Sequence, residues 1–168
     1  VYDRLITFGD RKLPDGSLTY DYSTIRGELA ERFEVSPDGK VLTFHLRKDA
    51  TFHDGTPVTA ADVKWSFDRA VGWGDGAAKG QFGLSSMTQP DQFTVVDANT
   101  FRITVPRADR YLLPNLCTHY AKVFNSALAK KNATDADPWA SAWLKQNVAG
   151  GGAFKVESWQ PGKQIALA

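Results

Sequence analysis

The chain has 168 residues, of which 42% are hydrophobic and 23% are charged, a balance typical of one globular domain. Its net charge of +1 gives no electrostatic basis for binding nucleic acid, and its single cysteine excludes an internal disulfide. The sequence has no apolar run of about 18 residues, so we expect no insertion of this segment into a membrane.

The N-terminal quarter of the sequence indicates extended chain, a loop and then a hairpin. We expect residues 1–8 to mix a short helix end with an extended run, and residues 9–23 to form a turn-rich loop around a Pro-Asp-Gly turn. A second Pro-Asp-Gly turn, within 36–40, predicts a hairpin of strands 31–35 and 41–47. Apolar and polar residues alternate along the second of these strands, so one face should be buried.

A capped helix is predicted next. Thr59 followed by Asp62 resembles a capping box, with Asp in place of the usual Glu, and the helix should run from Ala60 to Val71. Its apolar residues share one face, and they are Val63, Phe67, Ala70 and Val71. Gly72 should end this helix.

The segment from Gly72 to Gly83 is predicted to be a glycine-rich loop that exposes two aromatic residues. Trp73 and Phe82 lie among these glycines and are our candidates for contact with a ligand. The alternative is that both rings fold back and cover the core, as most aromatic residues do.

The rest of the chain predicts another hairpin, three helices and a last pair of strands. The hairpin joins 93–96 to 101–105, and Pro161-Gly162 separates the last two strands. The helices are expected at 111–120, 126–131 and 138–146. These elements predict an α+β fold, rich in hairpins, with a mostly antiparallel sheet and several helices.

Few residue patterns in the chain suggest catalysis. His45, His53 and Asp54 are of types that suit a metal-dependent hydrolase, but their spacing matches no compact ligand motif. Cys117 is predicted to be a buried core residue, and the alternative is a reactive thiol with His119 as its base. The sequence therefore predicts neither an enzyme, nor a metal site, nor a cofactor.

Three glycines near the C-terminus form a second candidate site. Gly150, Gly151 and Gly152 could cradle a phosphate if a helix followed them. A strand is expected to follow instead, which favours a tight turn or a hinge.

The motifs of residues 29–71 closely resemble those of the extracellular solute-binding proteins of family 5, the dipeptide- and oligopeptide-binding subunits of ABC importers. The matching residues are Leu29-Ala30, Ser36 with Asp38-Gly39, Phe44–Arg47, Phe52–Pro57, and Thr59 with Asp62-Val63. Gly150, Gly152 and Trp159 match a later family segment. Departures are Phe33 for the common Trp, and Gly151, Ala153 and Phe154 for Thr, Pro and Tyr, which places any hydrogen bond from those side chains in doubt.

The resemblance implies that the chain is a fragment of a two-lobed periplasmic binding protein of type II. It implies an extra subdomain at about 9–145, with short lobe I segments at 1–8 and 146–168. The expected location is the periplasm or a lipid anchor on the outer side of the membrane. Peptides and the permease subunits of an ABC importer are the expected partners, and oligosaccharides, opines, haem or nickel chelates are alternative cargoes. Gly150, Gly151 and Gly152 are our further candidates for contact with a ligand, near the junction of the lobes.

Overall fold

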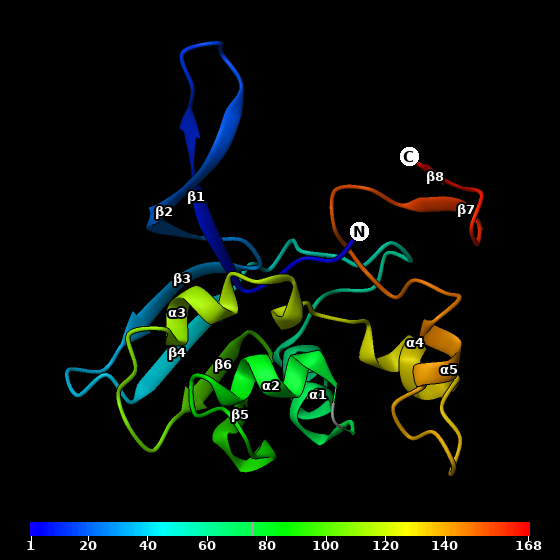
Figure 1. Ribbon diagram of the computed structural model, residues 1–168. Helices are drawn as coiled ribbons and strands as arrows, with labels where there is room; N and C mark the ends of the chain where they lie inside the picture. Colours follow the sequence, from blue (N-terminus) through cyan, green and yellow to red (C-terminus); the bar gives the residue numbers. More distant parts are fainter. Residues whose placement is uncertain (75) are drawn as a thin grey trace.

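The centre of the computed structural model, which describes residues 1–74 and 76–168, is a four-stranded antiparallel sheet (Figure 1). The strand order is β3-β4-β6-β5. The strands are β3 (Ala30–Val35), β4 (Val41–Leu46), β5 (Phe93–Asp97) and β6 (Thr100–Thr104). Both hairpins that the turn sequences predict are confirmed, and the α+β class with them.

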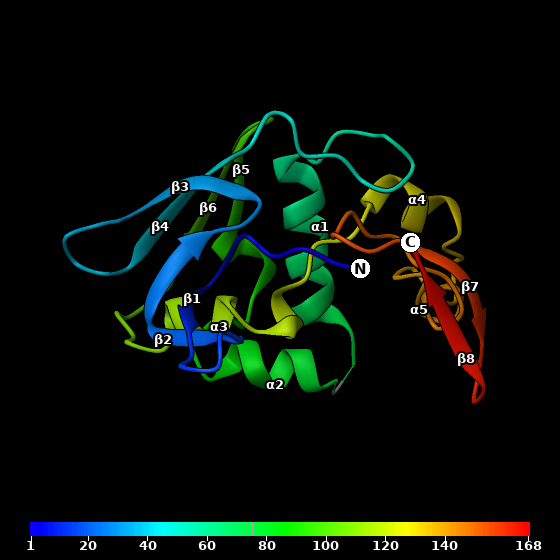
Figure 2. The ribbon, with the colours of Figure 1, turned by 90° about the horizontal axis from the view of Figure 1, so that it is seen from above.

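Helix α1 (Ala60–Gly72) covers one face of this sheet (Figure 2). Alternate residues of β4 and β6 point into that contact, which confirms the predicted burial of one face. At its centre the ring of Phe67 meets Phe82, Phe93 and Phe101 edge to face, with ring centroids 5.1, 5.4 and 5.5 Å apart. Such aromatic packing adds to the stabilisation from burial alone.

The shorter helices differ from the predictions in two places and agree in a third. Helix α4 (Ser126–Lys131) is confirmed. The helix predicted at 111–120 is divided into α3 (Leu112–Leu116) and a 3₁₀ turn, η2 (His119–Ala121). Helix α5 (Ser141–Leu144) is shorter than predicted because Ala140 has a left-handed backbone, with φ of 50°, which stops extension toward the N-terminus.

The glycine-rich loop predicted at 72–83 is wrong. Residues Ala77–Gly83 form helix α2, and a 3₁₀ turn, η1 (Pro90–Gln92), follows before β5. Packing of Phe82 against Phe67 favours helix here despite the low helix propensity of glycine. The part of the predicted loop at Asp75 lies outside the described residues.

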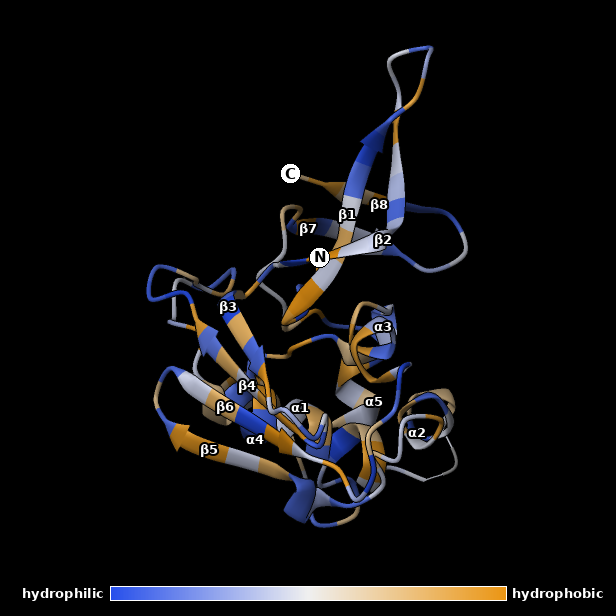
Figure 3. Ribbon diagram, turned by 90° about the vertical axis from the view of Figure 1, so that its left-hand side faces the viewer, coloured by the Kyte–Doolittle hydropathy of each residue, from blue (hydrophilic) through white to orange (hydrophobic). Residues whose placement is uncertain are grey.

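The Pro-Asp-Gly turn predicted at the centre of 9–23 is confirmed, but the loop predicted around it is wrong, because this segment forms a long hairpin that projects from the body of the molecule (Figure 1). Strands β1 (Ile6–Lys12) and β2 (Leu18–Gly27) pair antiparallel, and the turn between them contains Gly16 with φ of 86°. Residues 1–5 form no helix. Figure 3 shows hydrophobic residues at the start of β1, beside the body, and hydrophilic residues farther out.

The final strand pair forms a separate two-stranded sheet. Strands β7 (Val156–Gln160) and β8 (Gln164–Leu167) are confirmed, with the predicted Pro-Gly turn between them. The N-terminus lies beside the segment that leads into β7 (Figure 1). Within the described residues, no helix is both long and apolar enough to cross a membrane.

Candidate functional site

The outer face of α1 carries four polar or aromatic residues in a row. Asp62, Ser66, Arg69 and Trp73 are separated by four, three and four positions, which places them on one side of the helix. The apolar residues that the periodicity predicts, Phe67 among them, face the sheet. Helix α1 therefore has a second, polar and aromatic face that the hydrophobic pattern alone does not reveal.

Asp62 and Ser66 attach the chain segment 124–126 to α1. The buried Asp62 carboxylate accepts hydrogen bonds from Ser126 N at 3.0 Å and Ser126 Oγ at 2.7 Å. Its other oxygen accepts from Thr59 N at 3.0 Å and Thr59 Oγ1 at 2.7 Å, so the predicted pairing of these two residues is confirmed. Ser66 Oγ accepts from Phe124 N at 2.9 Å. These bonds position the segment that forms the second wall of a cavity.

This cavity, which we name the Trp73 cavity, has a volume of about 190 Å³. Its walls come from Arg69 of α1, from Trp73, from the start of α2 and from the segment 120–124. The Arg69 guanidinium carbon lies 4.7 Å from the Trp73 ring centroid and 5.2 Å from that of Phe124. Lys122 Nζ lies 5.7 Å from the Phe124 centroid. Two cations and two aromatic rings thus share one small space.

The two cations of the Trp73 cavity lack a carboxylate partner within the part of the chain that the structure describes. The ion pairs there involve neither Arg69 nor Lys122. Burial lowers the pKa of Lys122, and the charge of Arg69 lowers it further. Burial likewise lowers the pKa of Arg69. Both groups are half-buried, so the cavity carries positive charge that water only partly solvates.

The structure separates the two aromatic candidates. Trp73 lines the cavity and remains 40% exposed, which suits the predicted contact with a ligand. Phe82 has no exposed surface and belongs to the core, so its predicted exposure is wrong. A ligand therefore has no access to Phe82 in this arrangement.

The three glycines lie where the N-terminal segment and the residues after β4 meet the chain leading into β7. A Cβ at Gly150 would stand 2.0 Å from Val1 O, and one at Gly151 would stand 2.6 Å from Thr51 O. Gly152 N donates to Val1 O at 3.1 Å. The close approach of neighbouring backbone explains why glycine occupies these positions. Their role in ligand binding stays a prediction.

A second cavity of about 210 Å³ adjoins these glycines and contains His53 and Asp54. His53 Nε2 lies 2.7 Å from Gly152 O, and the Asp54 carboxylate accepts from Thr56 N at 3.0 Å and from Asn125 Nδ2 at 2.8 Å. These bonds hold the turn and the chain crossing together. His45 instead lies on β4, 3.5 Å from Glu34.

The residues of the hydrolase alternative are thus not brought together. Among the described residues, no group of three His, Cys, Asp or Glu side chains could hold a metal ion. A hollow of about 460 Å³ along the β1–β2 hairpin is lined by Arg4 and Arg26. Both are already paired, with Glu28 at 2.9 Å and Asp10 at 3.0 Å. The Trp73 cavity is therefore our candidate site.

Cys117 is buried, as its apolar sequence context predicts. Burial raises the pKa of its thiol to about 11, so the group stays protonated at neutral pH. His119 is exposed and stacks on Tyr120, with ring centroids 3.9 Å apart. These surroundings favour a core residue over a nucleophile.

We expect Cys117 to resist alkylation in the folded protein. Iodoacetamide at pH 8 should modify it at least about tenfold more slowly than in urea, because both burial and the raised pKa suppress the thiolate. Mass spectrometry of timed samples measures both rates. Rapid stoichiometric labelling of the folded protein would contradict this assignment and revive the reactive thiol.

Comparison with known proteins places this arrangement in a family. Residues 24–168 match the model of the bacterial extracellular solute-binding proteins, family 5. The chain belongs to this family. The match includes α1, the Trp73 cavity and the three glycines.

Two proteins whose names or titles state a ligand are similar to nearly the whole chain. The "Probable D,D-dipeptide-binding periplasmic protein DdpA" of Escherichia coli (strain K12) is 36% identical over 99% of this chain, which spans 29% of that protein. A binding protein of A. tumefaciens R10, solved with mannopinic acid, is 30% identical, with TM-score 0.80. The match covers 99% of this chain and 30% of that one.

A Helicobacter pylori periplasmic protein, DppA, solved with the peptide STSA, is 25% identical, with TM-score 0.76. The match covers 99% of this chain and 33% of that one. The chain therefore spans about a third or less of the proteins it resembles. The fold is that of this family of periplasmic binding proteins.

Arg69 and Lys122 are site residues that the sequence predictions omit. The four-residue spacing from Arg69 to Trp73 could have suggested the first of them, because it places both on one face of a helix. Lys122 is 53 positions from Arg69 in the sequence and no local pattern connects them. The docking of the segment 124–126 onto Asp62 and Ser66 brings them together.

Proposed function

We propose that the protein is the solute-binding component of an ABC importer and captures di- and oligopeptides. The observation that carries this proposal is the match to family 5 over residues 24–168, joined to 36% identity with a relative named for dipeptide binding. Capture in this mode uses backbone hydrogen bonds and water-filled pockets, and it needs no catalytic group. The permease of the importer is the partner that receives the peptide.

In this proposal the chain supplies one wall of a two-lobed binding site. Residues 9–145 form the extra subdomain, and 1–8 and 146–168 belong to lobe I. The contact of residues 1–2 with the glycines at 150–152 supports this division, because the two short segments meet there. The protein would act in the periplasm or on the outer side of the membrane through a lipid anchor.

Trp73 is the residue proposed to touch the ligand from this wall. Its ring is 40% exposed, and the Arg69 guanidinium carbon lies 4.7 Å from the ring centroid. A rigid aromatic surface of this kind contributes contact area at little entropic cost. The glycines at 150–152 are proposed to lie near the lobe junction and to contribute backbone groups to the site.

An opine is the second candidate cargo. The similarity to proteins of A. tumefaciens R10 that were solved with mannopinic acid and with agropinic acid supports it. Both candidates, a peptide and an opine, would place part of the ligand in the Trp73 cavity. The choice between them is made by titration.

Isothermal titration of the full-length protein should decide between these ligands. We expect saturable binding of a short peptide and no binding of mannopinic acid. Binding of mannopinic acid alone would contradict the peptide proposal. The same titration with Trp73→Ala should give about tenfold weaker binding, because an aromatic contact of this size contributes more than about 1 kcal/mol.

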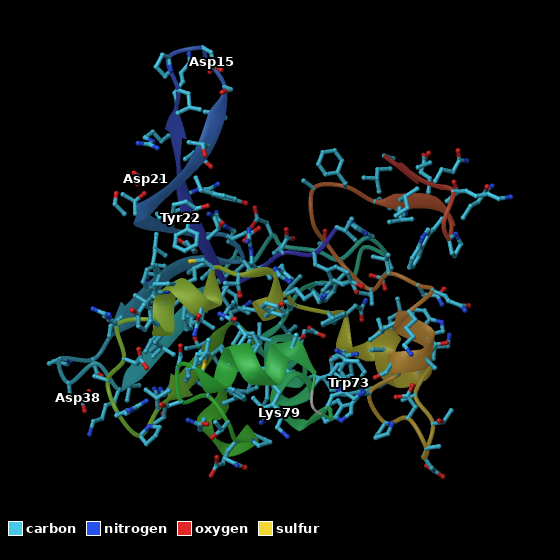
Figure 4. The ribbon with its side chains drawn as sticks, in the orientation of Figure 1. Asp15, Asp21, Tyr22, Asp38, Trp73 and Lys79 are labelled. Atoms are coloured by element: carbon cyan, nitrogen blue, oxygen red, sulfur yellow. The ribbon has the colours of Figure 1, made fainter. Side chains whose placement is uncertain are left out.

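Tyr22→Ala is the matched control for Trp73→Ala. Tyr22 is 73% exposed on β2, and Figure 4 shows it on the projecting hairpin, away from Trp73. Its removal should leave the affinity unchanged. Equal affinities for wild type, Trp73→Ala and Tyr22→Ala would remove Trp73 from the proposed site but would leave the transport proposal standing.

A further inference from the structure

The Trp73 cavity has a chemical preference that follows from its charges. Arg69 and Lys122 both lie within 6 Å of the Phe124 ring centroid, at 5.2 and 5.7 Å. Both cations are half-buried, and the charge of Arg69 acts on Lys122, so the two repel each other. A bound anion would remove that repulsion and replace the lost water.

Neither cation is neutralised from within the described part of the chain. The Arg69 Nε donates to the Trp139 carbonyl at 3.2 Å and Nη2 donates to Ser141 Oγ at 3.4 Å, which leaves the remaining guanidinium N–H groups for a ligand. Within the described residues, the Lys122 ammonium lies near the rings of Tyr2 and Phe124, 5.6 and 5.7 Å from their centroids. Asp137 acts electrostatically on Arg69, but its carboxylate accepts from Ala142 N at 2.7 Å.

The shape of the cavity limits what the anion can be. A volume of about 190 Å³ accommodates a carboxylate with a few neighbouring atoms, not a whole peptide. Trp73 and Phe124 form apolar walls that suit the carbon atoms next to the carboxylate. Arginine offers a carboxylate two parallel N–H donors, and lysine adds a point charge.

We propose that Arg69 and Lys122 form a carboxylate subsite in the Trp73 cavity, which takes the C-terminal carboxylate or an acidic side chain of the bound peptide. This inference rests on the proposed function, since it names the part of a peptide that the cavity selects. It makes the cavity the place where the ligand is oriented, while the remaining contacts with the peptide come from elsewhere in the protein.

The test is isothermal titration of the full-length protein with three tetrapeptides. They are Ala-Ala-Ala-Ala with a free C-terminus, the same peptide as its C-terminal amide, and Ala-Ala-Glu-Ala as its amide. A peptide with a carboxylate that reaches the subsite should bind about 10- to 100-fold more tightly than the uncharged amide. The free acid and the Glu amide then distinguish the C-terminus from a side chain as its source.

Variants of the two cations test whether the difference in affinity between the acid and the amide arises in the Trp73 cavity. Lys122→Met and Arg69→Met should reduce the gap between acid and amide, whereas Lys122→Arg should keep it. The control is Lys79→Met, an exposed lysine of α2 that does not line the cavity, which should leave the gap unchanged (Figure 4).

Equal binding of all three peptides by the wild-type protein overturns the subsite and leaves peptide capture intact. This comparison does not depend on the folding of any variant. A gap that persists in both Met variants also overturns the subsite. If none of the three peptides binds, the proposed function fails and the subsite fails with it.

Discussion

Replacing Asp62 with Ala is expected to destabilise the protein by about 3 to 5 kcal/mol. The buried carboxylate accepts four hydrogen bonds, two from Thr59 and two from Ser126. Its loss leaves the backbone N–H groups of both residues without a partner, and each buried unsatisfied donor costs about 1 to 3 kcal/mol. The start of α1 and the start of α4 would lose their common attachment. Urea unfolding followed by circular dichroism measures the change.

Asp68→Ala on the same helix is the matched control. Asp68 pairs with Lys64 at 3.0 Å across one helical turn, near the surface. An ion pair across one turn of a helix contributes less than about 1 kcal/mol, so this variant should unfold close to wild type. If the two variants lost equal stability, the attachment of α4 through Asp62 would not be the large contribution we assign to it. The Asp62 variant should also weaken the proposed peptide binding, because the bonds from Asp62 to Ser126 help to position Lys122 and Phe124 in the wall of the cavity.

Local rules explain why much of the fold can be predicted from the sequence. Strands β3 and β4 follow from a Pro-Asp-Gly turn and an alternating pattern, both of which act within a few residues. The start of α1 follows from Thr59 and Asp62, which are three positions apart. Each signal is contained in the segment that it shapes, and family motifs in the same segments pointed to the correct family.

Two of the wrong predictions failed because contacts outside the local segment decided the structure. The segment at 77–83 contains two glycines, but Phe82 packs against Phe67 from α1, and this burial favours the helix. Strand β1 contains Gly9 and three charged residues in a row, so its composition suggests loop. Its pairing with β2 satisfies the backbone, and the ring of Phe8 meets Tyr22 at 5.0 Å.

The candidate site shows the same division between local and distant causes. Trp73 follows from composition, because an aromatic residue at the end of a helix and among glycines is a reasonable contact for a ligand. The cationic pair cannot be predicted from local sequence, because Lys122 is placed near Arg69 by the hydrogen bonds from segment 124–126 to Ser66 and Asp62. Hydrogen bonds between α1 and a segment distant in the sequence therefore bring the two cations into one cavity.

Gly150→Ala is expected to destabilise the protein by about 2 to 3 kcal/mol and to weaken peptide binding. The added methyl group would stand 2.0 Å from Val1 O and 3.1 Å from the Tyr2 ring, so backbone must move. Gly152 N donates to Val1 O, and the Tyr2 hydroxyl accepts from Ala149 N at 3.2 Å. Movement would break these bonds, and it would displace Tyr2 from the Lys122 ammonium, 5.6 Å from its ring.

Gly80→Ala is the matched control, and its expected change in the free energy of unfolding has the opposite sign. A Cβ at Gly80 meets nothing within 4 Å, and the residue lies in α2, so alanine should stabilise the protein by about 0.5 to 1 kcal/mol. Urea unfolding and peptide titration of both variants test the pair. If Gly150→Ala were as stable as Gly80→Ala, the N-terminal segment would be able to move aside for the added methyl group without a cost in stability. The contact of residues 1–2 with the glycines at 150–152 would then not fix the position of these glycines relative to the Trp73 cavity. The glycines and the cavity would not form one rigid wall of the binding site.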